Sequence, residues 1–457
     1  MDRINHISSI NYYNFKNEIV IVILGCGESG FGAALLAKQQ SIPVFISDNG
    51  AIHEDIKNQL VDLEIDFEEN GHELVFDITP TYVIKSPGIP NKARVIVFFK
   101  EKNIPVISEI EFGFQFSKGA IIGITGSNGK TTTTNLVYHL LNEAGYKVVK
   151  SGNVGYSFCK AVSERKYDYY VLELSSFQLD DIIHFKPHIS TILNITPDHL
   201  DRYEYNFENY INSKFRILKN QDKEDYFYFL AEEELIKDRV ENLKPKVNQV
   251  PLKLQYNDQE ILTINESNFN LSYTCLKGRH NAKNATIALK IAMDLGISDV
   301  KLQSALESFV NDPHRLENVA SYENVEFIND SKATNVDSTF WALDAMKKKV
   351  VWIVGGQDKG NDYNILLPLV KDKVKAIVAL GVDNSKIVEF FSPYVPIIKE
   401  TNTMKDAVCN SFQLAETGEV VLLSPACASF DLFKNYMDRG DQFRTRVQEL
   451  KIKSWKQ

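Results

Sequence analysis

A run of small and charged residues lies between a six-residue apolar stretch and a helical stretch. It follows residues 120–125 and consists of Gly126, Ser127, Asn128, Gly129, Lys130, Thr131 and Thr132. The glycines let a backbone wrap phosphate oxygens, a lysine can place its charge near the β- and γ-oxygens, and a threonine hydroxyl can ligate Mg²⁺. Position 124 is Ile, where the strict phosphate-loop pattern has Gly. Because the run stands between a strand and a helix, the sequence predicts a phosphate-binding loop with ATP as its ligand.

A second glycine motif stands near the start of the chain. Gly25, Gly27 and Gly30 match G-x-G-x-x-G after the apolar residues 19–24, and Asp48 follows the next strand-like stretch. In this context the pattern is typical of a dinucleotide site, in which amides at a helix N-terminus meet a phosphate-bearing ligand. An NAD site, a nucleotide-sugar site and a tight turn without a ligand all remain open.

Potential metal ligands follow two further apolar stretches. Glu173 ends residues 171–173, and His199 comes shortly after residues 192–195. The carboxyl ends of parallel strands meet at one edge of a sheet, so we expect the two side chains to face one crevice. Mg²⁺ prefers oxygen ligands, which makes Glu173 the natural ligand and His199 the less typical one. Taken singly, each could be an ordinary polar residue at an element end, and Lys214 has the composition of a helix-surface lysine.

Two asparagines open a predicted helix over residues 285–293. Asn281 and Asn284 are three residues apart, which puts both amides on one helix face. The sequence leaves two roles open for these asparagines: capping the helix or contacting a purine base. Arg315 lies at a predicted domain junction, where its charged fork could clamp a triphosphate.

Three strand ends near the C-terminus carry many Lys, Thr, Ser and Gly residues. These residues lie at 329–335, 355–360 and 424–430, each directly after an apolar run. Each could be a capping turn, but together they form a rim that favours a carboxylate substrate over a cation.

The elements that must position these residues repeat one pattern. Apolar runs at residues 19–24, 120–125 and 350–354 each begin a series of alternating strands and helices. Near-continuous apolar strands alternating with helices indicate parallel sheets covered on both faces, an α/β fold. We predict three domains, at residues 1–107, 108–312 and 313–457. The polar residues 219–272 are expected to form an edge-strand excursion of the middle domain.

Composition limits the function classes. The formal net charge of −9 argues against nucleic acid as a main partner, since duplex affinity rests on basic residues. Five scattered cysteines without metal-type spacing indicate reduced thiols. No apolar run reaches the roughly 18 residues of a membrane span, and no signal-peptide pattern opens the chain. We therefore expect a cytoplasmic protein, and a monomer.

In their order along nearly the whole chain, these motifs resemble the bacterial Mur ligases. The most specific pieces are residues 126–132, 173–179, 330–335 and 424–429, and the last two favour the D-glutamate-adding branch. The resemblance implies a Rossmann-like UDP-binding domain, a central P-loop ATPase domain with a parallel sheet, and a C-terminal Rossmann-like domain that binds the amino acid.

The resemblance also assigns residues to the substrates. UDP-substrate contacts would be Glu28, Ser29, Asp48, Asn49, Ser86, Pro87, Gly88 and Asn153. ATP would be bound by residues 126–132 with Asn281, Arg315 and Asp330. D-Glutamate would meet Lys332, Thr334, Lys359, Ser429, Phe430 and Tyr436. Phe430 and Tyr436 stand where the family has Leu and Phe.

The catalytic residues implied in the same way are Lys130, Glu173, His199 and Lys214. One Mg²⁺ would bind Thr131 and Glu173, and a second would bind His199 and Lys214. In the family the lysine at the position of Lys214 is carbamylated, which turns a cation into an oxygen ligand. His199 is also a candidate base for the attacking amine, provided that it does not bind metal.

The implied reaction adds D-glutamate to UDP-N-acetylmuramoyl-L-alanine in peptidoglycan synthesis. ATP would phosphorylate the alanine carboxylate, and the amine would then attack the acyl phosphate. The rival functions are a ligase for another amino acid or a folylpolyglutamate-type ligase, an NAD-dependent oxidoreductase, and a nucleotide-binding regulator without catalysis.

Overall fold

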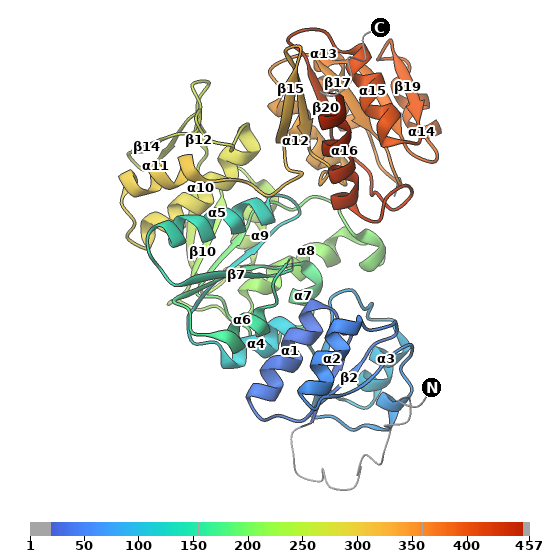
Figure 1. The fold of residues 1–457 in the computed structure, drawn as a ribbon. Helices are drawn as coiled ribbons and strands as arrows, with labels where there is room; N and C mark the ends of the chain where they lie inside the picture. Colours follow the sequence, from blue (N-terminus) through green and yellow to red (C-terminus); the bar gives the residue numbers. More distant parts are fainter. Residues whose placement is uncertain (1–19, 154, 359, 451–457) are drawn as a thin grey trace. The chain divides into compact units, whose positions relative to one another are not determined.

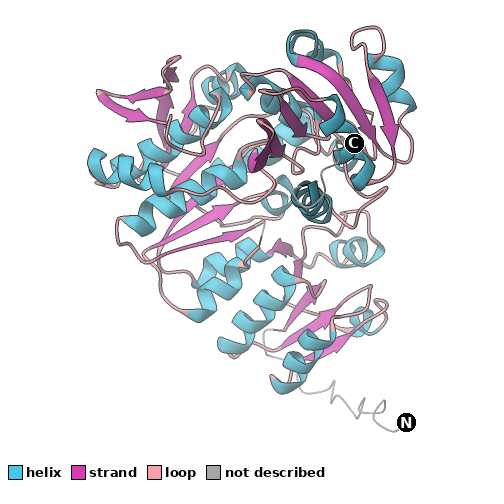
Figure 2. Cartoon of the chain, turned by 45° about the horizontal axis from the view of Figure 1, so that its top comes forward, coloured by secondary structure: helices cyan, strands magenta, loops and turns pink. Residues whose placement is uncertain are grey.

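The computed structural model describes residues 20–153, 155–358 and 360–450, and its elements alternate between strands and helices (Figure 1). The chain divides into two compact units, and the boundary lies between Lys253 and Leu254. That division coincides with neither domain boundary expected from the sequence, so the boundaries at 107 and 312 stay predictions. The α/β class itself is confirmed, and the strands of the sheets lie between helices (Figure 2).

The first sheet is entirely parallel, in the order β3-β2-β1-β4-β5. Its strands are β1 (Ile21–Leu24), β2 (Val44–Ser47), β3 (Asp66–Glu68), β4 (Tyr82–Lys85) and β5 (Val106–Ser108). Ile21 and Ile23 pack in a core with Leu36 of α1 (Glu28–Gln39). Val22 and Leu24 pack in the opposite core beneath α3 (Arg94–Glu101). The strand is apolar throughout because both of its faces are buried.

The second sheet is also parallel, in the order β11-β10-β9-β6-β8-β7. Its strands are β6 (Ala120–Thr125), β7 (Val148–Gly152), β8 (Tyr169–Glu173), β9 (Ile189–Ile192), β10 (Tyr226–Leu230) and β11 (Asn248–Leu252). The register pairs Ile124 with Glu173 and Thr125 with Ile192. The segments that follow these three strands therefore start at the same edge of the sheet.

The expectation for residues 219–272 is half right. β10 and β11 do extend the central sheet to its edge. However, β12 (Gln255–Tyr256), β13 (Ile261–Ile264) and β14 (Ser267–Asn270) form a separate antiparallel sheet in the second unit. The connections of four residues (257–260) and two residues (265–266) are too short for a parallel crossover, so these strands pair antiparallel with their neighbours in the chain.

The last sheet has the order β15-β16-β20-β17-β18-β19, with only β15 antiparallel. Its strands are β15 (Glu317–Tyr322), β16 (Val325–Asn329), β17 (Val350–Val354), β18 (Val374–Leu380), β19 (Ile398–Thr401) and β20 (Val420–Leu423). Val350, Trp352 and Val354 pack into one core, and Val351 and Ile353 into the other.

Helices complete the layers. They include α2 (Glu54–Asp62), α4 (Glu109–Phe116), α5 (Lys130–Glu143), α6 (Phe158–Glu164), α7 (Ser176–Asp180), α8 (Phe207–Phe215), α9 (Glu234–Leu243), α10 (Arg279–Asp294), α11 (Asp299–Ser308), α12 (Val336–Ala345), α13 (Leu367–Lys373), α14 (Ser385–Phe391), α15 (Met404–Leu414) and α16 (Tyr436–Leu450). Within the described ranges, none of the helices combines the length and apolar composition needed to cross a membrane.

Glu111 on α4 joins two segments that are distant in the chain. Its side chain is 1 % exposed, and its carboxylate accepts the backbone amides of Ile183, His184 and Phe185 at 2.8–2.9 Å. Phe185 is buried while Ile183 and His184 are exposed, and one carboxylate serves as the acceptor for all three amides.

We predict that Glu111→Ala lowers the free energy of unfolding of the first unit by about 3 kcal/mol, because three backbone amides lose one shared acceptor. Urea unfolding followed by circular dichroism measures the loss. The exposed Glu143→Ala is the matched control and should change stability by no more than about 0.5 kcal/mol. Equal effects of the two substitutions would contradict the role given to Glu111.

Candidate functional site

The phosphate loop predicted from the sequence joins β6 to α5 with two strained glycines. Gly129 caps α5 with φ 82°, and Gly126 has φ 153°. A Cβ on Gly126 would lie 3.1 Å from the Cβ of Leu193 and 3.3 Å from the carbonyl oxygen of Asn194. The backbone conformation of Gly126 therefore favours glycine, and a Cβ there would also crowd its neighbours. The turn places backbone amides at the N-terminus of α5, where an anion is favoured.

The segment after β9 holds this loop in place. Asn194 accepts the amide of Ser127 through its backbone oxygen at 3.0 Å and the amide of Asn128 through its side chain at 2.9 Å. The Ser127 hydroxyl donates to the carbonyl of Thr196 at 2.9 Å. Sequence reasoning gave no role to Asn194, although it is the one polar residue within residues 192–195.

Two lysines converge on one carbonyl of the loop. Lys130 and Lys214 each donate to the backbone oxygen of Gly126, both at 2.8 Å, and Lys130 also donates to Ser127 at 2.7 Å. Lys130 comes from the start of α5 and Lys214 from α8, 84 positions apart by their numbers. The structure thus brings together the two residues that the sequence could relate only through resemblance.

Lys214 is not a surface lysine, so the interpretation from composition alone is wrong. Its side chain is 1 % exposed and lies over the ring of Tyr210, 4.5 Å from the centroid. Burial, and next the charge of Lys130, lower the pKa of Lys214 well below its ordinary value, against the opposing carboxylates of Asp198 and Asp180. A lowered pKa makes the amine neutral, and hence nucleophilic, closer to neutral pH.

Tyr210 is a further residue that the sequence reasoning missed. Its hydroxyl lies 3.1 Å from the Ser127 hydroxyl, and burial raises its pKa. The signal was available, because Tyr210 precedes Lys214 by four residues and so shares its helix face.

Glu173 lies beside the loop at the end of β8. Its side chain is 3 % exposed, and the side-chain amide of Asn153 donates to it at 3.1 Å. Thr131, also buried, occupies the first turn of α5. Glu173 and Thr131 offer the carboxylate and hydroxyl oxygens that Mg²⁺ prefers.

His199 stands apart in exposure. It has φ 52°, its side chain is 49 % exposed, and its Nε2 lies 3.6 Å from a carboxylate oxygen of Asp198. The ring packs edge-on against Phe177, with 5.2 Å between centroids. It precedes the short helix η2 (Leu200–Arg202), so the polar residue predicted at a helix start is found there.

The donor sets fit the two predicted metal sites unequally. Glu173 and Thr131 suit Mg²⁺ as they stand. The Lys214 amine donates a hydrogen bond and offers no oxygen, so it suits a cation only after conversion to a carbamate. Among the described residues, no group of three or more His, Cys, Asp or Glu side chains gathers to hold a metal.

The first glycine motif also has geometry suited to a phosphate-bearing ligand. A Cβ on Gly30 would lie 1.8 Å from the Gly25 carbonyl oxygen, whereas a Cβ on Gly27 would meet nothing within 4 Å. Close helix packing and an open approach are the two uses of glycine in this motif. Asp48 accepts the amide of Cys26 at 2.6 Å and that of Gly50 at 2.8 Å.

The other predicted UDP contacts surround this turn. The Ser86 hydroxyl donates to the Gly25 carbonyl at 3.4 Å, and Glu28 accepts the amide of Ser157 at 3.2 Å. Ser29, Asn49, Pro87 and Gly88 are at least partly exposed in the same unit. Asn153 lies instead beside Glu173, as described above.

In the second unit, Asn281 and Asn284 do not cap α10. The cap is Gly278, and both asparagines are buried, with Asn284 donating to Asn281 at 3.4 Å and Asn281 donating to the Lys277 carbonyl at 2.9 Å. The capping alternative is therefore excluded, while a purine contact stays a prediction.

Arg315 and Asp330 lie close together in that unit. Asp330 accepts the amide of Leu316 at 3.2 Å and the hydroxyl of Ser424 at 2.9 Å. Burial raises the pKa of Asp330 to about 7, against these hydrogen bonds and the charges of Arg315 and Arg439.

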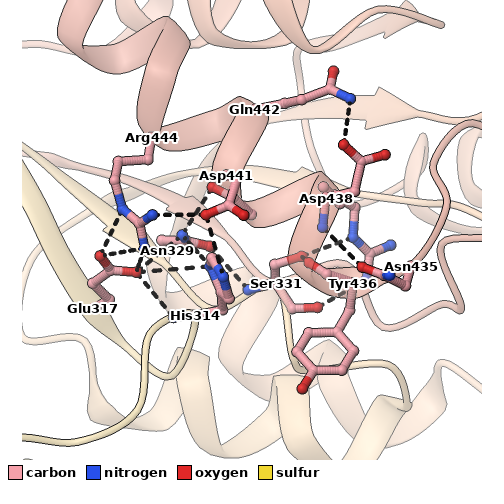
Figure 3. A network of polar contacts seen from close by, with 12 residues as sticks. His314, Glu317, Asn329, Ser331, Asn435, Tyr436, Asp438, Asp441, Gln442 and Arg444 are labelled. Atoms are coloured by element: carbon pink, nitrogen blue, oxygen red, sulfur yellow. Dashed lines mark hydrogen bonds and ion pairs between the residues drawn. The ribbon is translucent and has the colours of Figure 1, made fainter. Parts of the chain in front are cut away.

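Figure 3 shows a polar network around His314 and Glu317, which stand on either side of Arg315 in the chain. His314 Nδ1 lies 2.9 Å from the side-chain amide of Asn329, and Arg444 binds Glu317 through two nitrogens at 3.0 Å. A Cβ on Gly440 would lie 2.2 Å from His314 Nδ1, so α16 approaches His314 as closely as glycine permits. The network fixes both ends of the segment that carries Arg315.

The predicted amino-acid residues are only partly brought together. The Lys332 ammonium lies 5.3 Å from the centroid of the Tyr436 ring, and Ser331 donates to the Tyr436 carbonyl at 2.8 Å. Ser429 is buried, whereas Thr334 is exposed and Phe430 is 66 % exposed. Lys359 lies outside the described residues.

Comparison with known proteins places the whole chain among similar sequences. Residues 19–95 match a MurD N-terminal domain, residues 124–292 a Mur ligase middle domain, and residues 314–427 a Mur ligase, glutamate ligase domain. A protein of Christiangramia forsetii named UDP-N-acetylmuramoylalanine--D-glutamate ligase is 51 % identical over 94 % of this chain and 99 % of its own. One of the same name from Cytophaga hutchinsonii is 48 % identical over the same shares.

A solved structure shares the fold. UDP-N-acetylmuramate-alanine ligase MurC from Thermotoga maritima aligns with a TM-score of 0.59 over 94 % of this chain and 100 % of that one, at 19 % sequence identity. At this identity the likeness supports the architecture alone.

The buried amine predicts a pH-dependent stability. The folded-state pKa of Lys214 is below its ordinary value of 10.5, so the unfolded chain binds more protons between those two values. Stability then rises with pH in that window, by at most about 1.4 kcal/mol per pH unit. Lys214→Met removes this contribution, and its free energy of unfolding should gain less between pH 7 and 9 than that of the wild type. Urea unfolding in CO₂-free buffer measures both, and equal gains would contradict the prediction.

Proposed function

The chain belongs to the Mur ligase family, and from this membership we propose that it joins D-glutamate to UDP-N-acetylmuramoyl-L-alanine in peptidoglycan synthesis. Mur ligases are ATP-dependent enzymes that form amide bonds, so the chain is a ligase. The observation that carries the specific proposal is the match to two ligases of that name over 94 % of this chain. The lysine pair at the phosphate loop supports the ATP-dependent step.

The first step activates a carboxylate. A carboxylate resists attack by an amine, because it is anionic and lacks a good leaving group. An oxygen of the alanine carboxylate bonds to the γ-phosphorus of ATP, the bond to the β-phosphate oxygen breaks, and ADP leaves. Lys130 and the amides at the start of α5 would hold the phosphates and offset the charge that moves between them.

The second step forms the amide. The neutral amine of D-glutamate attacks the acyl phosphate carbon, the carbon–nitrogen bond forms, and inorganic phosphate leaves as the carbon–oxygen bond breaks. The amine must lose a proton, and the half-exposed ring of His199 is a candidate acceptor in an enzyme in which that ring does not bind metal. His199 could serve in this way only while it is not a metal ligand.

Mg²⁺ would be held by Thr131 and Glu173, and there it would neutralise charge on the nucleotide phosphates. We propose a second site at His199 and the carbamate of Lys214. Carbamate formation needs a neutral amine, and the buried, pKa-lowered Lys214 supplies one. The carbamate is an oxygen donor at the position where the amine now meets Gly126.

The remaining roles follow the same family pattern. Asp48 and residues 86–88 would hold the UDP portion, Asn281, Arg315 and Asp330 the nucleotide, and Lys332 with Lys359 the carboxylates of D-glutamate. Thr334, Ser429, Phe430 and Tyr436 would complete the amino-acid pocket. We further propose that the enzyme acts as a cytoplasmic monomer.

The decisive experiment measures phosphate release with ATP, UDP-N-acetylmuramoyl-L-alanine and a panel of amino acids. We expect release to depend on D-glutamate, and we expect Lys130→Ala to lower kcat at least about a hundredfold while the protein stays folded. Release that depends on L-alanine, L-lysine or diaminopimelate instead would assign a sister ligase. Nicotinamide-dependent absorbance changes without phosphate release would revive the oxidoreductase alternative.

The carbamate has its own test. We expect ¹³C-labelled bicarbonate to give a carbamate NMR signal in the wild type and none in Lys214→Ala. Activity of that variant should fall at least about a hundredfold and recover in part when a short carboxylate is added, since the carboxylate replaces the missing oxygen donor. The exposed Lys237→Ala is the matched control and should keep both signal and activity. A wild-type enzyme that is active without the signal would refute the carbamate.

A further inference from the structure

Arg202 joins two parts of the first unit that hold different predicted ligands. It ends η2, three residues after His199, and it lies opposite the loop of residues 86–89, which follows β4. Its guanidinium donates to the carbonyls of Pro87 and Gly88 at 3.4 Å and to that of Ile89 at 3.5 Å. One side chain therefore spans three successive carbonyls of the predicted UDP loop.

The same guanidinium lies over an aromatic ring that touches His199. Its carbon is 4.4 Å from the centroid of the Phe177 ring, and Phe177 meets the His199 ring edge-on at 5.2 Å. Tyr203 stacks on Phe177, with centroids 5.9 Å apart and planes at 14°. A continuous chain of contacts, here called the arm, thus runs from the loop through Arg202 and Phe177 to His199.

Lys85, which stands just before the loop, contacts the segment that carries Phe177. Lys85 is 3 % exposed and pairs with Asp181 at 2.7 Å, and Asp181 directly follows α7, which carries Phe177. Lys85 also donates to Asn91 at 3.2 Å. A buried ion pair keeps its geometry, because breaking it leaves an uncompensated charge. The loop is consequently held by two segments, through Asp181 directly after α7 and through Arg202 of η2.

We propose that Arg202 is a positioning residue that sets the UDP loop relative to His199. This inference rests on the proposed function, because the loop must carry the UDP-substrate for its position to matter. A substrate seated on residues 86–88 would then present its reacting carboxylate at a set distance from the phosphate loop. Displacement of about 1 Å can cost roughly a hundredfold in rate, so the position of the loop would appear in kcat and not only in affinity.

Arg216, which begins η3 (Arg216–Leu218), offers a matched control that also contacts the α7 segment. It donates to the carbonyls of Leu179 at 2.7 Å and Ile182 at 2.9 Å, at the far end of α7. It makes the same kind of contact as Arg202 but reaches neither the loop nor His199 in any recorded hydrogen bond. A purely structural role for arginine at α7 would give the two positions similar effects on activity.

The test compares Arg202→Ala, Arg202→Lys and Arg216→Ala in D-glutamate-dependent phosphate release. For Arg202→Ala we expect kcat/KM for the UDP-substrate to fall roughly ten- to a hundredfold, with kcat reduced at saturation and KM for ATP unchanged. Arg202→Lys should recover only part of the loss, since a single ammonium cannot span three carbonyls. Arg216→Ala is expected to lower Tm and to keep kcat/KM within about twofold of the wild type.

A second comparison isolates the arm. Phe177→Leu should reproduce part of the loss, and the double variant with Arg202→Ala should lose no more than Arg202→Ala alone, because both substitutions break one connection. Calorimetric titration of UDP-N-acetylmuramoyl-L-alanine into each variant gives binding without turnover.

The outcomes separate the two proposals. Wild-type kcat/KM in Arg202→Ala, or losses that follow Tm equally for Arg202 and Arg216, would overturn the positioning role while leaving the ligase assignment intact. A wild-type protein that binds the UDP-substrate but releases no phosphate would overturn the proposed reaction, and a titration that Arg202→Ala leaves unchanged would then overturn the positioning role as well. A wild-type protein that does not bind the UDP-substrate would overturn both.

Discussion

The register of β8, β6 and β9 is the constraint on which the ATP-dependent chemistry depends. Ile124 pairs with Glu173, and Thr125 pairs with Ile192, so the three strands end level with one another. Parallel strands deliver their following segments to the same edge, which is where open α/β sheets bind ligands. A shift of one residue would reverse the facing of each strand and move Glu173 off the crevice. The phosphate loop, Glu173 and the segment before His199 are therefore set by backbone pairing before any side chain contributes.

At this edge of the sheet, two lysine side chains meet at a single backbone carbonyl. Lys130 and Lys214 both donate to Gly126, and the charge of Lys130 disfavours the charged form of Lys214. The arrangement is costly for two cations and suitable for an anion, or for one cation beside a lysine converted to a carbamate. Such like-charge convergence at a buried turn has a clear use if polyphosphate binds there. It has no equally direct use in a turn that binds nothing.

In the second unit, a network of polar contacts adds to strand register in positioning the predicted nucleotide-binding residues. Arg315 follows His314, which is wedged between Asn329 and Gly440, and Asp330 follows Asn329 at the end of β16. Arg444 and Glu317 brace the same segment (Figure 3). Neither Gly440 nor Arg444 stands out in the sequence, because each acts through a contact made more than 100 residues away.

The sequence alone determined the strand–turn–helix around residues 126–132, the α/β class and the order of the motifs, because these depend on local periodicity and on glycines that strained turns require. It did not determine that Lys214 is buried, that Asn281 and Asn284 pair with each other, or that β12 to β14 leave the central sheet. Those outcomes rest on packing between distant segments. The local sequence around a helical lysine is the same whether that face of the helix meets water or Gly126. Tertiary structure alone decided that the pKa of Lys214 is lowered, because desolvation and a neighbouring charge come only from the folded arrangement.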